Sequence, residues 1–446
     1  MSTRNQASTA QSAPFRSIEN DGESESEGPS SSSDLSTPNR WSDHRPVQEG
    51  QSPTQCSVAL LTGGDDKPYV VGLATALTSK GITVDLIGSD DLEVADLVNL
   101  EGLRFLNLRQ DQRPEANLIS KARRILRYYL RLIHYAATAQ PRVFHILWNN
   151  KFELFDRTIL LIYYKMCGRR IVFTAHNVNM RKRDGNDSWS NRISLKIQYR
   201  LVDHIFVHTE KMRSELLSDF DVPDRKVSII PFGINNTVPD TKLTAREAKK
   251  QLGIAFSCKT LLFFGQIAAY KGLEYLVEAF EKLVRTGEDY HLVIAGRPKR
   301  GNERYWEDIR STIPLKSLAG RITQSIEHIP DEKVELYFKA SDVLVLPYTA
   351  IFQSGVLFLS YSFGLPVIAA DVGTLKEEIS EGETGLVFRS RDSIDLARII
   401  AQYFQSGLFS ELESRRPAIR RYANERYSWD EVAAKTTRIY SGLLGR

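Results

Sequence analysis

Two turns in this sequence have residue types that suit phosphate binding. The apolar run TLLFFG ends at Gly265, a loop containing Gln266 and Lys271 follows, and Gly272 precedes a helical pattern. Loop amides and the N-terminus of a helix attract anions, and a lysine adds a mobile positive charge. The spacing alone fits equally well with a surface lysine in an ordinary strand-to-helix turn.

The second turn is the run Gln353-Ser354-Gly355-Val356, between the apolar stretch DVLVLP and the apolar helix LFLSYSFG. Its small residues allow the backbone to approach a ligand and to point several N–H groups at it. An N-cap by Ser354 is the alternative interpretation, and it is compatible with ligand binding. The glycine pair Gly63-Gly64 also follows an apolar strand, but it does not complete the pattern G-x-G-x-x-G.

Five further residues lie where two predicted strands end. His176 closes the stretch RIVFTAH and Asn177 follows it, while Trp148, Asn149 and Asn150 end the preceding strand. Ligands of parallel sheets bind beyond the carboxyl ends of the strands, so these residues are candidates for an acceptor pocket. A lone histidine is more often structural, and the strand-end position favours a functional role.

Apolar strands alternate with helical stretches in two successive parts of the chain, residues 55–238 and residues 239–428. Strands that are apolar on both faces and alternate with helices predict parallel sheets covered on both sides. We therefore predict an α/β protein with two doubly wound, Rossmann-like domains facing a central cleft. Thr244 and Glu247 predict a capping box at the first helix of the second part. The last helix, within residues 429–446, is expected to pack back across the domain junction.

The composition narrows the class of protein and its partners. The chain has 446 residues, a net charge of +4 and three widely separated cysteines. This charge does not call for a nucleic-acid partner. The cysteines have neither zinc-ligand nor disulfide spacing, which favours the cytoplasm. We expect no secretory signal, because the first residues lack a charged stretch followed by an apolar region, and no apolar run is long enough to span a bilayer. Residues 1–54, rich in serine and acidic residues, are expected to be a disordered tail.

Several longer segments, in this order and spacing, resemble the retaining GT-B glycosyltransferases of family 4, the "group 1" family. They are TAHNV, HTEKMRSEL, IPFGI, FGQIAAYKG, IEHIPDEKVELYFKASDVLVLPY, FGLPVIAADVGTLKEEISEGETGLV and YSWDEVAAKTTRIY. The resemblance extends from about Cys56 to Tyr440, and any one segment alone would not be specific.

The resemblance implies a role for each matching residue. His176 would contact the transferred sugar, and Lys271 would neutralise the diphosphate of a nucleotide-sugar donor. The amides near Ser354, Gly355 and Val356 would hold the distal phosphate. The loop with Glu327 and His328 would receive the base, and Gly64 and Gly265 belong to the same expected donor site. The family also implies retention of the anomeric configuration and no metal or other cofactor, because positive charge and backbone dipoles stabilise the leaving group.

Two departures from the family pattern concern the donor site. The family has an arginine where this chain has Gln266, and Arg297 or Lys299 is a candidate source of the missing charge. The paired glutamates of the family fall near Ile351 and Leu359, and neither residue is acidic. We expect amide and hydroxyl groups such as those of Gln353 and Ser354 to bind the donor instead.

Two other functions compete with sugar transfer to a polysaccharide, glycolipid or small glycoside. A degenerate relative that binds a nucleotide sugar as a scaffold or regulator, without turnover, would explain the missing glutamates. A dinucleotide oxidoreductase is disfavoured because the first strand-to-helix turn lacks G-x-G-x-x-G.

The predicted helix over residues 118–138 has a basic, amphipathic pattern. Arg123, Arg127 and Arg131 recur at four-residue spacing beside apolar residues. Such a helix in the acceptor-binding half could rest on the anionic cytoplasmic face of a membrane that holds a lipid-linked acceptor. A solvated helix face over a packed core is the alternative.

Overall fold

The structure is a computed structural model, and it describes residues 56–63, 67–92, 97, 100–110, 118–183, 185–234, 238–315, 318, 320–351 and 353–445. All of these residues belong to one compact unit. The predicted tail over residues 1–54 and the predicted donor-site residue Gly64 lie outside the described residues.

The first half contains a seven-stranded sheet in which every neighbouring pair of strands is parallel. The strand order is β3-β2-β1-β4-β5-β6-β7. The strands are β1 (Ser57–Leu61), β2 (Thr83–Gly88), β3 (Leu103–Asn107), β4 (Val143–Ile146), β5 (Arg170–Thr174), β6 (His204–Val207) and β7 (Val227–Ile229). The order reverses direction between β1 and β4, which makes the carboxyl ends of these two strands the expected binding edge.

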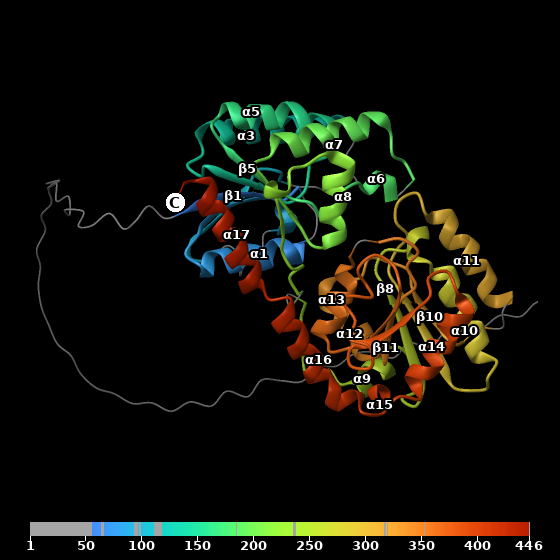
Figure 1. Cartoon of the computed structure of the whole chain (residues 1–446). Coiled ribbons are helices and arrows are strands. Elements are labelled where there is room, and N and C mark those ends of the chain that lie inside the picture. Colours follow the sequence, from blue (N-terminus) through green and yellow to red (C-terminus); the bar gives the residue numbers. More distant parts are fainter. Residues whose placement is uncertain are drawn as a thin grey trace, which may run out of the picture. The chain divides into compact units, whose positions relative to one another are not determined.

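Helices cover both faces of this sheet. One face packs against α3 (Leu118–Thr138), α5 (Leu161–Met166), α7 (Trp189–Leu201) and α8 (Glu210–Phe220). The other face packs against α1 (Lys67–Ser79) and the last helix, α17 (Trp429–Leu443). Figure 1 shows α3, α5 and α7 on one side of the strands and α1 with α17 on the other. Shorter elements are η1 (Asp90–Leu92), α4 (Glu153–Phe155), η2 (Asp156–Leu160), α6 (Met180–Arg183) and η3 (Asp224–Lys226).

The second half contains a six-stranded parallel sheet with the order β10-β9-β8-β11-β12-β13. The strands are β8 (Lys259–Phe264), β9 (Tyr290–Ala295), β10 (Ile322–Ser325), β11 (Val343–Leu346), β12 (Val367–Ala370) and β13 (Gly385–Phe388). The helices are α9 (Ala245–Gln251), η4 (Ala269–Lys271), α10 (Leu273–Val284), α11 (Glu303–Leu315), α12 (Asp331–Lys339), α13 (Gly355–Ser362), α14 (Ser393–Phe404), α15 (Gly407–Ser410) and α16 (Leu412–Arg426). Here the order reverses direction between β8 and β11.

These two sheets confirm the prediction of two doubly wound, Rossmann-like α/β halves. Every residue of β4, β9 and β11 is buried, as the uninterrupted apolar runs indicated. The predicted helix over residues 118–138 is α3, and the capping box of Thr244 and Glu247 is present at the start of α9. The exact domain boundaries at residues 54, 238 and 428 stay predictions.

The last helix, α17, is fixed to the first half at its first residue. The indole ring of Trp429 fits against two glycines, because a Cβ on Gly72 or on Gly233 would lie 2.2 or 2.3 Å from ring carbons. Its Nε1–H donates to the carbonyl oxygen of Ile234 at 2.9 Å. The chain therefore leaves the second half at α16 and returns to pack on α1. Among the described residues, no helix combines the length and apolar character needed to cross a bilayer.

Candidate active site

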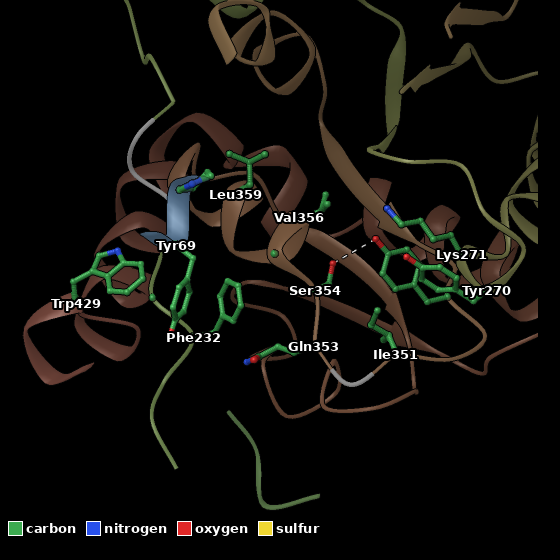
Figure 2. Close-up of a pocket in the computed structure, with 14 residues that line it drawn as sticks. Tyr69, Phe232, Tyr270, Lys271, Ile351, Gln353, Ser354, Val356, Leu359 and Trp429 are labelled. Atoms are coloured by element: carbon green, nitrogen blue, oxygen red, sulfur yellow. Dashed lines mark hydrogen bonds between the residues drawn. The ribbon is translucent and has the colours of Figure 1, made fainter. Parts of the chain in front are cut away.

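A cavity of about 330 Å³ lies at the switch point of the second sheet, beyond the ends of β8 and β11. Its lining includes Lys271 from the first predicted phosphate turn and Ser354, Gly355 and Val356 from the second. Figure 2 shows the Lys271 ammonium directed toward the turn that carries Ser354 and Val356. The structure thus brings together residues that are more than eighty positions apart in the sequence.

The backbone around Lys271 depends on glycine. Gly272 adopts a φ of +63°, and a Cβ at this position would lie 2.1 Å from the carbonyl oxygen of Pro347, at the end of β11. Gly265 has a φ of +95°, and its added Cβ would lie 3.1 Å from the Nζ atom of Lys271. Only residues without a side chain allow this close packing, which holds the buried Lys271 side chain against the cavity. The Lys271 Nζ atom lies 5.4 Å from the ring centre of Tyr348.

The second turn leads directly into α13, whose first residue is Gly355. Ser354 occupies the N-cap position, but its side chain makes no cap hydrogen bond. Its hydroxyl instead lies 3.4 Å from the hydroxyl of Tyr348. The predicted N-cap position of Ser354 is therefore confirmed, although its side chain does not cap the helix. The N-terminal end of α13 adds partial positive charge to the lining of the cavity.

The two positions at which the family has glutamates also line this cavity. They are Ile351 and Leu359, so apolar side chains line the cavity where the resemblance to the family would place carboxylates. Gln353, which also lines it, donates from Nε2 to the buried carboxylate of Glu378 at 3.1 Å. The other oxygen of Glu378 accepts a short hydrogen bond from Tyr427. Burial raises the pKa of Glu378. The amide of Gln353 is thereby held in one orientation, and its Oε1 has no hydrogen-bond partner among the described residues.

Four predicted donor-site residues are exposed and are not part of this cavity's lining. They are Gln266, Arg297, Glu327 and His328. The carbonyl of Arg297 accepts a backbone hydrogen bond from Ile267 at 2.9 Å. Lys299, the alternative source of charge, has its Nζ atom 5.8 Å from the ring centre of Tyr270, which does line the cavity.

A second cavity, of about 500 Å³, lies at the switch point of the first sheet. It is lined by His176 and by the other residues predicted for the acceptor pocket, Trp148, Asn149, Asn150 and Asn177. Gly63 lets Trp148 approach, because a Cβ on Gly63 would lie 2.5 Å from the Trp148 carbonyl oxygen. The Trp148 indole stacks on the His176 imidazole with ring centres 4.1 Å apart and an angle of 4° between the planes.

The hydrogen bonds of His176 define its tautomer. Nδ1 of His208 lies 3.2 Å from the carbonyl oxygen of Ile230, which can only accept, so His208 donates from Nδ1. Burial lowers the pKa of His208 to about 4, so its Nε2 is an acceptor at neutral pH. Nδ1 of His176 lies 3.0 Å from that Nε2 and must be the donor. The Nε2 lone pair of His176 is therefore available, and this buried atom has no partner in the described part of the chain.

Burial also keeps His176 neutral. Desolvation, and then the charges of His208 and His145, lower the pKa of His176 well below its usual value. A neutral imidazole with an unprotonated Nε2 is a hydrogen-bond acceptor for a hydroxyl group. The edge of Tyr69 packs against this ring at 4.7 Å between centres. The ring of Phe232 lies 6.1 Å from it, and both Tyr69 and Phe232 line the first cavity, so aromatic rings lie between the histidine and that cavity.

Asn149 and Asn177 of the acceptor pocket differ in whether their side-chain polar atoms have hydrogen-bond partners. The Asn149 amide exchanges two hydrogen bonds with the Gln198 amide, both at 3.2 Å, and acts as part of the wall. Oδ1 of Asn177 is buried and has no hydrogen-bond partner among the residues described. It is therefore the better candidate for contact with a ligand.

Sequence reasoning missed four residues that shape the two cavities. His208 could have been found, because it follows the strand HIFV just as His176 follows the neighbouring strand. Tyr69, Tyr348 and Glu378 carry no spacing signal, and they reach the site through the packing of helices and loops.

Family models of known proteins match both halves of the chain. The family model described as "Glycosyltransferase Family 4" matches residues 68–237, and the model "Glycosyl transferases group 1" matches residues 258–406. D-inositol 3-phosphate glycosyltransferase of Corynebacterium diphtheriae is 24% identical over 404 residues, covering 83% of this chain and 88% of that protein.

Solved structures show the same fold. Sucrose-phosphate synthase from Thermosynechococcus elongatus has a TM-score of 0.67 at 18% identity, covering 88% of this chain and 99% of that one. The Anabaena protein HepE, solved in complex with UDP-glucose, has a TM-score of 0.66 at 15% identity, covering 86% of this chain and 99% of the other.

The two sheets, with a cavity at each switch point, define the GT-B fold. The chain belongs to the family 4, group 1, glycosyltransferases.

Proposed function

We propose that this protein transfers a sugar from a nucleotide-diphosphate sugar to a hydroxyl acceptor, with retention and without a metal ion. The observation that carries the proposal is the shared cavity of Lys271 and the Ser354–Val356 turn. An ammonium group and a helix N-terminus in one cavity suit a diphosphate. HepE, which shares the fold, was solved with UDP-glucose bound, and this supports the same class of donor.

In the proposed reaction the bond between the anomeric carbon and the diphosphate oxygen breaks. The positive charge of Lys271 and the dipole of α13 stabilise the negative charge that develops on that oxygen. The acceptor oxygen forms the new bond on the face that the leaving group vacates, and its proton passes to the departing diphosphate. The Nε2 atom of His176 accepts a hydrogen bond from a hydroxyl of the transferred sugar.

The acceptor is proposed to occupy the cavity that contains Trp148, Asn177 and His176. It would be a polysaccharide, a glycolipid or a small glycoside. We further propose that the protein works in the cytoplasm, with peripheral contact between α3 and a membrane.

A thermal-shift panel of UDP-, GDP-, ADP- and TDP-sugars tests donor binding, because a ligand that binds the native state raises Tm. One nucleotide should raise Tm selectively, in the presence of EDTA as well as with Mg²⁺. No shift with any nucleotide sugar would overturn the proposal. The anomeric configuration of the product, read by NMR, tests retention.

A scaffold that binds a nucleotide sugar without turnover is the second candidate. The apolar side chains of Ile351 and Leu359 in the donor cavity favour it, since both replace carboxylates of the family. Donor hydrolysis separates the two functions, because a transferase releases the free sugar slowly even without its acceptor. A selective thermal shift with neither hydrolysis nor transfer, across a broad set of acceptors, would favour the scaffold.

A further inference from the structure

Large apolar side chains are exposed mainly in one region of the molecule. Of the twelve that are exposed among the described residues, seven lie on α3 or on the continuous segment α4–η2–α5, and an eighth, Phe152, directly precedes α4. They are Ile119, Leu126, Leu130, Phe152, Leu154, Ile159, Ile162 and Met166. Met166 is 80% exposed and Ile119 is 75% exposed, so these side chains are not the edges of a packed core.

These side chains form one surface, which we name the docking face. The hydroxyl of Tyr163 in α5 donates to the carbonyl oxygen of Ile133 in α3 at 3.1 Å. The ring of Tyr129 in α3 stacks on Phe152 at 5.8 Å between centres. Both segments cover the same face of the first sheet, so the sides that point away from the sheet adjoin each other.

The lysine and arginine side chains of α3 give this part of the docking face a positive charge. This helix contains Lys121, Arg123, Arg124, Arg127 and Arg131, and it contains no aspartate or glutamate. The second segment has two carboxylates, and neither offsets that charge. Glu153 pairs with Arg157 and Arg181 at 3.2 and 3.0 Å, and Asp156 is buried with its Oδ1 accepting from Tyr129 at 2.9 Å.

We propose that the docking face binds an anionic lipid bilayer, and that the bilayer supplies a lipid-anchored acceptor to the adjacent cavity. Long apolar side chains mixed with arginines match the interfacial region, where the chains insert and the guanidinium groups contact phosphates. A second copy of this chain fits less well, because a two-fold contact would bring the five cations of α3 against another five.

The acceptor cavity meets the docking face at α4 and η2. Lys151, Glu153 and Arg157 line the cavity, while Phe152 and Leu154 between them are exposed. A lipid tail in the bilayer would therefore lie beside the opening through which its sugar or phosphate headgroup enters. The docking extends the proposed membrane contact of α3 and does not depend on sugar transfer, whereas this second part of the inference rests on the proposed transferase activity.

Co-sedimentation of the full chain with vesicles tests the docking. The protein should bind vesicles made of equal parts of phosphatidylcholine and phosphatidylserine, and bind phosphatidylcholine alone at least tenfold more weakly. Replacing Arg123 or Arg127 by alanine should lower the partition coefficient about fivefold for each arginine. The double change Ile162→Ser with Met166→Ser should lower it by about tenfold or more.

Matched controls are Phe256→Ser and Ile394→Ser, which remove exposed apolar side chains of the second half and should leave binding unchanged. Absence of binding to the anionic vesicles, equal binding to both kinds of vesicle, or full binding by the docking-face variants would each overturn the proposal. Thermal unfolding of each variant confirms that it is folded. Donor binding without vesicles is measured separately. A thermal shift with one nucleotide sugar of the panel, found while vesicle binding fails, refutes docking alone. The absence of a shift with every nucleotide sugar of the panel refutes the proposed function.

Discussion

Replacing His208 by phenylalanine tests the account of the acceptor-side histidine. The ring of His208 packs against Phe232 at 5.0 Å between centres, and a phenyl ring would preserve that contact. The change removes the acceptor of the His176 Nδ1–H and the donor to the Ile230 carbonyl. Each of these two buried polar groups, left unpaired, costs about 1–3 kcal/mol, so we expect the free energy of unfolding to fall by about 2–6 kcal/mol.

The same substitution should also change the state of His176. Without an acceptor at Nδ1, the neutral ring is free to carry its proton on Nε2, which then donates instead of accepting. Nitrogen NMR of labelled protein reports the tautomer directly, and urea denaturation reports the stability. Turnover should fall by about tenfold or more, while the affinity for the donor stays close to that of the unmodified chain.

Two variants make this prediction specific. His208→Gln retains an acceptor and a donor at the end of the side chain, so it should restore much of the stability and turnover that His208→Phe loses. His291→Phe removes a buried histidine that bonds Thr323 at 2.8 Å, and it should lower stability without changing the NMR signals of His176. A His176 that carries its proton on Nε2 in the unmodified protein would refute the reasoning.

Two further predictions concern stability. Gly272→Ala should lower the free energy of unfolding by about 2–3 kcal/mol in urea denaturation, because its Cβ would meet the Pro347 carbonyl. Gly253→Ala, with a φ of +70° and open space around it, should cost only about 1 kcal/mol, and equal costs would count against the steric argument. Acid should also destabilise the protein, because burial lowers the pKa of His145 to about 3 and those of His204 and His208 to about 4. The unfolded chain binds more protons below about pH 6.5, so the stabilising contribution of these histidines is full above that pH. It should fall by about 1 kcal/mol per histidine as the pH is lowered from 7 to 5.5. A Tm that increases as the pH is lowered over this range would contradict the assignment.

The sequence predicted the architecture well because buried parallel strands leave long apolar runs. It also placed Lys271, the Ser354 turn and His176 at strand ends, and the parallel sheets bring those ends to common edges. The three helices between residues 393 and 426 were not predicted. The longest of them, α16, is mostly charged and contains Pro417, so it lacks a clear apolar period.

Contacts that depend on loop packing could not be predicted from the sequence. Glu378 reaches Gln353 from 25 positions away, and no local pattern signals this pairing. Arg297 and Glu327 were chosen by residue type, and both are exposed. Their contact with a donor stays a prediction, because a side chain's direction after a turn depends on backbone angles that sequence spacing does not define.

Calorimetric titration of nucleoside diphosphates into the Lys271→Ala protein, with EDTA present, tests the diphosphate site most directly. The loss of one charged hydrogen-bond donor should weaken Kd for the preferred nucleotide by about 10- to 100-fold. Lys282→Ala, which removes an exposed lysine of α10, should bind like the unmodified chain. An unchanged Kd in Lys271→Ala would contradict the claim that this ammonium group holds the donor diphosphate.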